Sequence, residues 1–229
     1  MNQLRLAVVV SSTCAVLATL ACHTATAQTP PGAVQPQGAP GMTPAQLAEL
    51  NGGISPFTTA DVQFMSGMIG HHAQAITMAG WAHSHGASGS VRTLCERIVV
   101  SQRDEIKYMQ EWLSDRHLTV PEADPRGYSM PGMDRPMLMP GMLTTEQMSA
   151  LDQARGAQFD IAFLTDMIAH HRGALVMVHQ LMSSPGAAQD AGLFAYATDV
   201  QAGQSAEIDR MQRMLGNVAA DRPHGHVDP

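Results

Sequence analysis

Residues 61–78 read DVQFMSGMIGHHAQAITM, and residues 160–177 read DIAFLTDMIAHHRGALVM. Eight of these 18 aligned positions are identical, including a pair of adjacent histidines. The segments that follow repeat as well, because Gln, Glu, Ile, Met, Gln and Leu recur in the same order within residues 102–113 and 204–215. A tandem duplication of one helical hairpin explains this pattern. Since each hairpin has to bury an apolar face, we expect an all-α fold, an antiparallel four-helix bundle.

Turn and cap signals set the expected boundaries around the repeats. Thr144 and Gln147 form a capping-box pattern, and Pro185-Gly186 marks a turn. We predict long helices over residues 58–84, 89–116, 144–182 and 187–217. The expected segments are a first hairpin over residues 57–118, a Met- and Pro-rich loop over residues 119–143, and a second hairpin over residues 144–218.

The N-terminal segment has the pattern of an export signal. Arg5 precedes an apolar stretch over residues 6–20, and Ala25-Thr26-Ala27 reads as a small-x-small cleavage site. We therefore predict a signal peptide over residues 1–27 and a periplasmic location. The apolar stretch is too short to cross a bilayer comfortably, so we expect no transmembrane span in the mature chain. The alternative is a lipoprotein anchored through Cys22.

Two further segments have compositions that are unsuited to a packed core. Residues 28–56 are expected to form a flexible Pro- and Gly-rich tether with a short helix. Residues 219–229 are expected to form a tail that contains histidine.

The composition favours helices and excludes a nucleic-acid partner. Hydrophobic residues make up 45% of the chain and aromatic residues only 4%, which suits closely packed helices better than a β-sandwich. The formal charge is −7 and Lys107 is the only lysine, so the basic patch that phosphate binding needs is missing. Of three cysteines, only Cys95 lies outside the predicted signal peptide, and we expect it to be packed and unpaired.

The repeated helix carries soft-metal donors on one face. On a helix, Met68, His71 and Met78 share a face, and His72 lies one turn from Met68. The second repeat reproduces this arrangement, so packing the two faces together would pool four imidazoles and four thioethers. The candidate metal ligands are Met68, His71, His72, Met78, Met167, His170, His171 and Met177.

The donor types favour copper. Thioether sulfur is soft and selects Cu(I), whereas imidazole accepts Cu(I), Cu(II) and zinc. Cu(I) is therefore the favoured cargo, with zinc and silver as alternatives. Thiolates are nearly absent, which weakens a structural zinc site, and the Glu-x-x-His pairs of a di-iron bundle are missing. The alternative without metal is that the methionines fill the core and the histidines are hydrogen-bonded internally.

Polar residues of both repeats are candidates to support the histidines or to bind metal themselves. A Gln and a Glu lie on the otherwise apolar stripe of each second helix, and if buried they need partners. The ring N–H of a ligating histidine is such a partner. An Asp at the start of each first helix would cap it, interact with its dipole, or ligate. These residues are Asp61, Asp160, Gln102, Glu105, Gln204 and Glu207.

Accessory metal sites are expected outside the repeats. The loop holds five methionines within thirteen residues, where packing alone gives little reason for them. We interpret the loop as an exposed, flexible trap for soft metals; docking onto a partner is the alternative. Two His-x-His elements are further candidates, although both are equally consistent with solvated polar residues. The accessory candidates are Met130, Met133, Met137, Met139, Met142, His83, His85, His224 and His226.

The pattern D-x2-F-x3-M-I-x-H-H-x2-A-x2-M occurs twice, and each copy is followed by Q-x2-E-I-x2-M. With these motifs, residues 57–217 resemble the family named domain of unknown function 305, DUF305. The resemblance implies a ferritin-like four-helix bundle and a relation to exported bacterial proteins that bind copper and confer copper tolerance. It also implies that Met68, His71, His72, Met78 and their counterparts in the second repeat are the ligands.

Three functional hypotheses follow. The first is a non-enzymatic periplasmic protein that sequesters copper, confers tolerance to it or delivers it, together with an envelope protein that donates or accepts the metal. The second is a copper-dependent oxidase. The third is a metal-free structural or interaction bundle.

Overall fold

The computed structural model describes residues 57–129 and 134–220 of the chain. Some predictions lie outside these residues: the signal peptide, Cys22, the tether with its short helix, Met130, Met133, His224 and His226. The helices are α2 (Thr59–Gly80), α3 (Gly89–Asp115), α4 (Thr145–Gln153), α5 (Ala157–Ser183) and α6 (Ala191–Ala220). Among the described residues, none of these helices is both long and apolar enough to cross a membrane.

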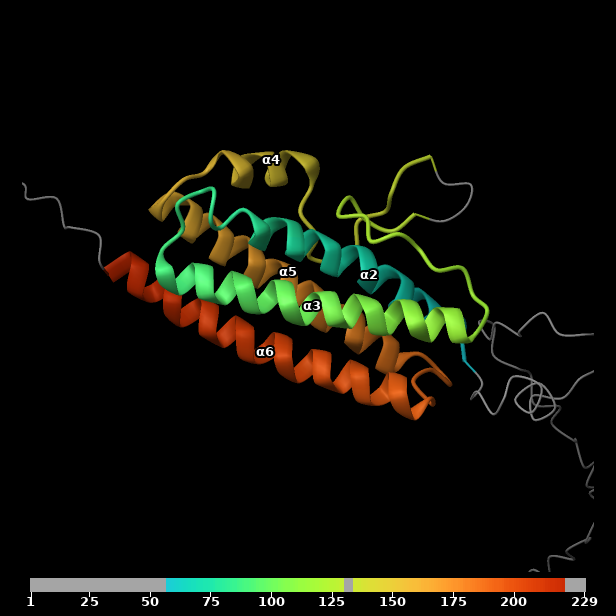
Figure 1. Ribbon diagram of the computed structural model, residues 1–229. Coiled ribbons are helices and arrows are strands. Elements are labelled where there is room, and N and C mark those ends of the chain that lie inside the picture. Colours follow the sequence, from blue (N-terminus) through green and yellow to red (C-terminus); the bar gives the residue numbers. More distant parts are fainter. Residues whose placement is uncertain (1–56, 130–133, 221–229) are drawn as a thin grey trace, which may run out of the picture.

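Four of these helices form the bundle that the duplication predicts (Figure 1). α2 packs antiparallel against α3, α5 packs antiparallel against α6, and α2 and α5 join the two hairpins. α4 lies across the outer side of α2 and α5. The prediction of an all-α bundle built from two hairpins is confirmed.

Side-chain caps fix where α2 and α4 begin. Thr58 and Asp61 form a capping box at α2, and Thr144 forms one with Gln147 at α4, as its sequence pattern predicts. The prediction of one continuous helix over residues 144–182 is wrong. The chain turns extended at Ala154, and Gly156 has a positive φ of 55°, so α4 ends and α5 begins after a short break. Gly156 tolerates this conformation because it has no Cβ atom.

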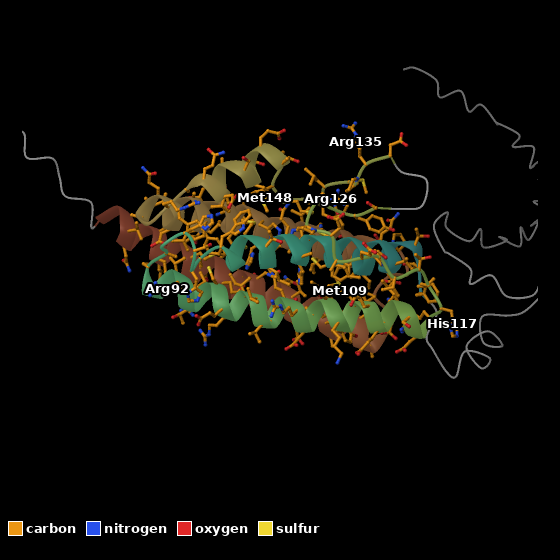
Figure 2. The ribbon with its side chains drawn as sticks, turned by 45° about the horizontal axis from the view of Figure 1, so that its top comes forward. Arg92, Met109, His117, Arg126, Arg135 and Met148 are labelled. Atoms are coloured by element: carbon orange, nitrogen blue, oxygen red, sulfur yellow. The ribbon has the colours of Figure 1, made fainter. Side chains whose placement is uncertain are left out.

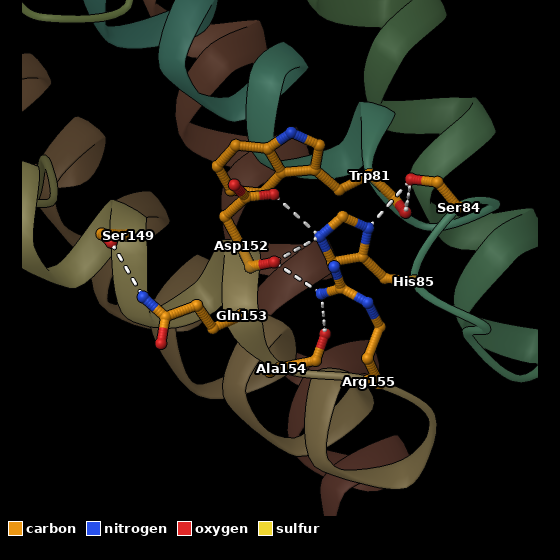
Figure 3. Close-up of polar contacts among 8 residues, drawn as sticks. All are labelled: Trp81, Ser84, His85, Ser149, Asp152, Gln153, Ala154 and Arg155. Carbon is orange, nitrogen blue, oxygen red and sulfur yellow. Dashed lines mark hydrogen bonds and ion pairs between the residues drawn. The ribbon is translucent and has the colours of Figure 1, made fainter.

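The break between α4 and α5 is held by a buried histidine (Figure 3). His85, which is 5% exposed, contacts the Asp152 carboxylate and carbonyl through Nε2 at 2.9 and 2.8 Å. Its Nδ1 lies 2.9 Å from the Ser84 hydroxyl, and its ring stacks on Trp81. Both ring nitrogens of His85 are thus engaged, so the predicted His83-x-His85 element is not preformed for metal. His83 itself is exposed and lies 3.3 Å from Glu96.

The duplicated aspartates tie the two hairpins together. The Asp61 carboxylate accepts a hydrogen bond from the amide of Ala188, in the α5–α6 turn, at 2.7 Å. In the equivalent contact of the second hairpin, the Asp160 carboxylate accepts a hydrogen bond from the amide of Ser88, in the α2–α3 turn, at 3.2 Å. Both aspartates are buried, and of the roles proposed for them the structure supports the structural one.

The core consists of two clusters of buried apolar side chains. The first cluster includes Met68 and Met177, and the second includes Met78 and Met167. Cys95 packs in the second cluster at 2% exposure, and burial, aided by Asp160, raises the pKa of its thiol to about 12. Cys95 is therefore a packed thiol, as expected, and not a reactive one.

Candidate metal centre

The four repeat histidines lie in the centre of the bundle, on α2 and α5. His71 and His170 face each other with ring centroids 3.8 Å apart and planes inclined by 39°. Each is followed directly by the second histidine of its pair, and the ring centroids within a pair are 6.1 and 6.3 Å apart. All four side chains are at most 1% exposed. We call these four residues, His71, His72, His170 and His171, the histidine layer.

A carboxylate of the neighbouring helix holds one histidine of each pair. Nε2 of His72 lies 2.6 Å from the Glu105 carboxylate, and Nε2 of His171 lies 2.6 Å from that of Glu207. In a neutral ring, Nε2 then carries the proton that the carboxylate accepts, so Nδ1 keeps a free lone pair. A carboxylate that orients a histidine in this way is the usual support of a metal-bound imidazole.

Several buried polar atoms in this layer have no hydrogen-bond partner. They include Nδ1 of all four histidines and Nε2 of His170. The Gln102 side-chain amide and the Gln204 amide oxygen are also unpartnered. Such atoms cost free energy when buried, and a native protein keeps them where an unseen group satisfies them. A metal ion that accepts imidazole lone pairs fits these residues.

Methionine sulfur is the other donor type near the histidines. Met68, Met78 and Met167 are fully buried and Met177 is 5% exposed. Because they divide between the two core clusters, each cluster contributes one thioether from α2 and one from α5. Met109 and Met211 on the partner helices are fully buried too, although the sequence marks them only as part of an inner stripe.

The histidine layer is not a finished metal site. Within the described part of the chain, no three His, Cys, Asp or Glu side chains converge as a preformed metal-binding group. The three ring-to-ring distances show that the histidines share one region without forming such a group. A metal here therefore needs either thioether ligands or a rotation of the rings.

The metal-free protein should lose stability between neutral and mildly acidic pH. Burial holds the pKa of His71 and the pKa of His170 well below 6.5; nearby imidazoles add to this, His72 most for His71 and His71 most for His170. Both rings are neutral in the folded protein, whereas the unfolded chain binds protons at these positions below about pH 6.5. Since the unfolded state binds more protons, the free energy of unfolding decreases as the pH is lowered, by up to about 1.4 kcal/mol per pH unit for each ring.

Urea unfolding at about pH 7.5 and about pH 5.5 measures this slope, above the range in which most carboxylates titrate. The variant His71→Leu/His170→Leu is the control, because it lacks both rings and should lose most of the slope. An unchanged slope in the variant would assign the effect to other groups.

The loop between the hairpins packs against the histidine layer, and we call its residues 136–143 the strap. The Pro140 carbonyl accepts from Nε2 of His71 at 3.1 Å. Buried Gln74 bonds to two distant parts of the loop. Its amide donates to the carbonyls of Pro125, before the strap, and Leu143, at the end of the strap, and it accepts from the Leu143 amide at 2.7 Å. The strap can approach so closely because Gly173 on α5 has no side chain where the strap backbone lies.

The loop is thus less exposed than predicted. Met142 is 8% exposed and Met139 is partly buried, whereas Met137 is 46% exposed. A surface cavity of about 770 Å³ lies between the loop and α4, with Arg126 and Arg135 among its lining residues, but no histidine lines it. Figure 2 shows both arginines on the loop side of the molecule, away from α3.

Two neighbours of the site carry no signal in the sequence. One is the Pro140 carbonyl, whose approach depends on a loop conformation that spacing does not reveal. The other is Tyr196 on α6, whose pKa is raised well above its usual value by burial and by the Glu105 carboxylate. Its buried hydroxyl has no hydrogen-bond partner.

Comparison with solved structures finds the same fold in proteins from other sources. A DUF305 protein from Streptomyces coelicolor, itself predicted to be secreted, is 28% identical with a TM-score of 0.60; the match covers 72% of this chain and 97% of that one. CopM in its Cu(II)-bound form is 26% identical with a TM-score of 0.54, covering 69% and 96%. CopM in its Cu(I)-bound form is 27% identical with a TM-score of 0.51 and the same coverage.

Sequence comparison gives a shorter match and a family. The protein L153 of Acanthamoeba polyphaga mimivirus is 38% identical over 58 residues, which are 25% of this chain and 38% of the viral protein. The family model described as Domain of unknown function (DUF305) matches residues 61–215, which include both repeats and all four histidines of the layer. The chain therefore belongs to the DUF305 family.

Proposed function

We propose that this chain is an exported, periplasmic copper-binding protein that holds Cu(I) in the histidine layer. The observation that carries the proposal is the set of buried imidazole nitrogens without partners, placed in the same core as four thioethers. Copper would be cargo that the protein sequesters or passes to another envelope protein. The role proposed is binding, not catalysis.

The chemistry of the donors supports copper over other metals. Neutral imidazole and thioether together suit Cu(I), while a hard cation would need carboxylate oxygens that are not free in this layer. The solved structures of CopM include Cu(I)-, Cu(II)- and silver-bound forms, and that protein shares the fold. Silver and zinc remain alternative cargoes.

Each residue type has a distinct role in the proposed site. His71 and His170 approach each other most closely and would supply nitrogen ligands from α2 and α5. His72 and His171 would bind through Nδ1, with Glu105 and Glu207 fixing the rings. Met68, Met78 and Met167 would supply sulfur after small side-chain adjustments, which unbranched methionine permits.

Burial argues against an oxidase. The four rings are at most 1% exposed, so a substrate would have no open position at the metal without displacement of the strap. The metal-free alternative leaves the unpartnered nitrogens without explanation. Oxygen uptake during Cu(I) loading would favour the oxidase.

An anaerobic Cu(I) titration against a Cu(I)-specific chelator, with ¹⁵N NMR of the imidazoles, tests the proposal. We expect tight binding and large shifts of the Nδ1 signals of the histidine layer, while exposed His83 and His179 stay unchanged. Zinc is the matched control metal and should compete weakly. Binding without imidazole shifts would move the copper elsewhere, and no binding would end the copper proposal.

A further inference from the structure

A second group of methionines lines a cavity between the strap and the bundle. This cavity has a volume of about 250 Å³, and Met137, Met139 and Met177 all contribute to its wall, beside Phe64 and Tyr128. Two of the methionines come from the strap and the third from α5. None of the described lining residues is charged, so a hard divalent cation would find no carboxylate among them.

The side chains of Met139 and Met177 both approach a glycine of α2. A Cβ atom at Gly67 would lie 2.7 Å from Sδ of Met139 and 3.5 Å from the terminal methyl of Met177. The absence of a side chain at Gly67 therefore leaves the space that these two methionine side chains border. An alanine there would push the Met139 sulfur away from its present position.

The third methionine is held in place by backbone hydrogen bonds. Met137 and Tyr128 form an antiparallel bridge, with N–O distances of 2.9 and 2.7 Å in the two directions. The exposure of the three methionines decreases inward, from 46% at Met137 to partial burial at Met139 and 5% at Met177. Pro140, which follows Met139, contacts His71, so the middle of this series borders the histidine layer.

We propose that Met137, Met139 and Met177 form a separate all-thioether site for a soft monovalent cation, Cu(I) or Ag(I). Among the lining residues that the structure describes, thioether sulfur is the only soft donor, and three thioethers suit these cations and no hard ion. The site goes beyond the proposed function because no histidine takes part in it, so it can bind metal whether or not the histidine layer does. It also assigns Met177 to the cavity instead of the histidine layer.

Silver nitrate titration of the protein with ¹³C-methyl-labelled methionine and ¹⁵N-labelled histidine tests this site. We expect the methyl signals of Met137, Met139 and Met177 to shift together and to saturate. In Met137→Leu/Met139→Leu, one equivalent of silver should be lost while the imidazole signals still respond. Leucine keeps the volume and polarity close to those of methionine, so the fold should persist. Met182→Leu is the matched control, since this exposed α5 methionine does not line the cavity.

The outcomes separate the two sites. If the imidazoles respond and the three methyl signals do not, the thioether site is wrong and the histidine layer stands. If the methyl signals respond and the imidazoles do not, the thioether site stands and the proposed function of the histidine layer is wrong. Equal loss of silver in Met182→Leu and in the double variant would also overturn the thioether site.

Discussion

Replacing His71 and His170 together with leucine is expected to stabilise the metal-free protein and to remove most of its stabilisation by Cu(I). In the wild type, Nδ1 of both rings and Nε2 of His170 are buried without partners. Each such atom costs about 1–3 kcal/mol, and apolar side chains of similar size avoid this cost. The variant loses the His71–Pro140 hydrogen bond, worth about 1 kcal/mol. We therefore expect a net gain of about 2 kcal/mol in the free energy of unfolding.

With Cu(I) present, the order of stability should reverse, so that the wild type is more stable than the double variant. A metal that binds only the folded wild type stabilises it by about 4 kcal/mol at a free concentration a thousandfold above its Kd. In the double variant this gain should nearly vanish, because the two closest imidazoles of the layer are gone. Urea unfolding with and without Cu(I), under anaerobic conditions, measures both effects in one experiment.

His179→Leu is the matched control for this variant. His179 lies on α5 like His170 but is exposed, so neither the apo stability nor the effect of Cu(I) should change noticeably. A double variant that is less stable than the wild type without metal would show that the imidazoles contribute to the fold. Full stabilisation of the double variant by Cu(I) would place the metal outside the histidine layer.

The histidine pairs and their partner glutamates could be predicted from the sequence because buried polar residues of this kind lower the stability of a protein without metal. A His-His pair in the core of a bundle is costly, so its duplication in register between methionines supports the proposal that it is kept for binding. The partner glutamates were predictable for the same reason: they recur on an apolar stripe, and they lie 2.6 Å from His72 and His171. Helical periodicity places such residues directly, because it relates sequence spacing to a shared face.

Contacts that depend on loops were not predictable from periodicity. The loop was expected to be an exposed trap, but hydrogen bonds between its backbone and the side chains of Gln74 and His71 hold part of it against α2. The end of α4 was missed because a helical pattern continues through residues 154–156, while the contact of His85 with Asp152 and the conformation of Gly156 favour a break. Both features arise from residues far apart in the sequence, about which local propensity says little.

The strap is expected to detach from the bundle when Gly173 is replaced with alanine. A Cβ atom at Gly173 would overlap the Pro140 carbonyl group and lie 2.6 Å from Cα of Gly141. These are backbone atoms, and Gly141 already has a positive φ of 80°, so the strap can relieve the overlap only by moving as a whole. We expect a loss of about 2–4 kcal/mol, larger than the gain of about 1 kcal/mol that alanine brings to a helix.

Gly203→Ala is the control that separates the overlap from helix propensity. Gly203 lies within α6, and a Cβ atom there would meet no other atom within 4 Å, so this variant should gain about 1 kcal/mol. Urea unfolding compares the two variants, and amide hydrogen exchange at Leu143 and Met137 reports whether the strap is still bonded. Faster exchange at both amides in Gly173→Ala, with the helices still protected, is the expected pattern. If Gly173→Ala matched Gly203→Ala in stability and exchange, the strap would not pack on α5, and His71 would lack the backbone contact that now covers it.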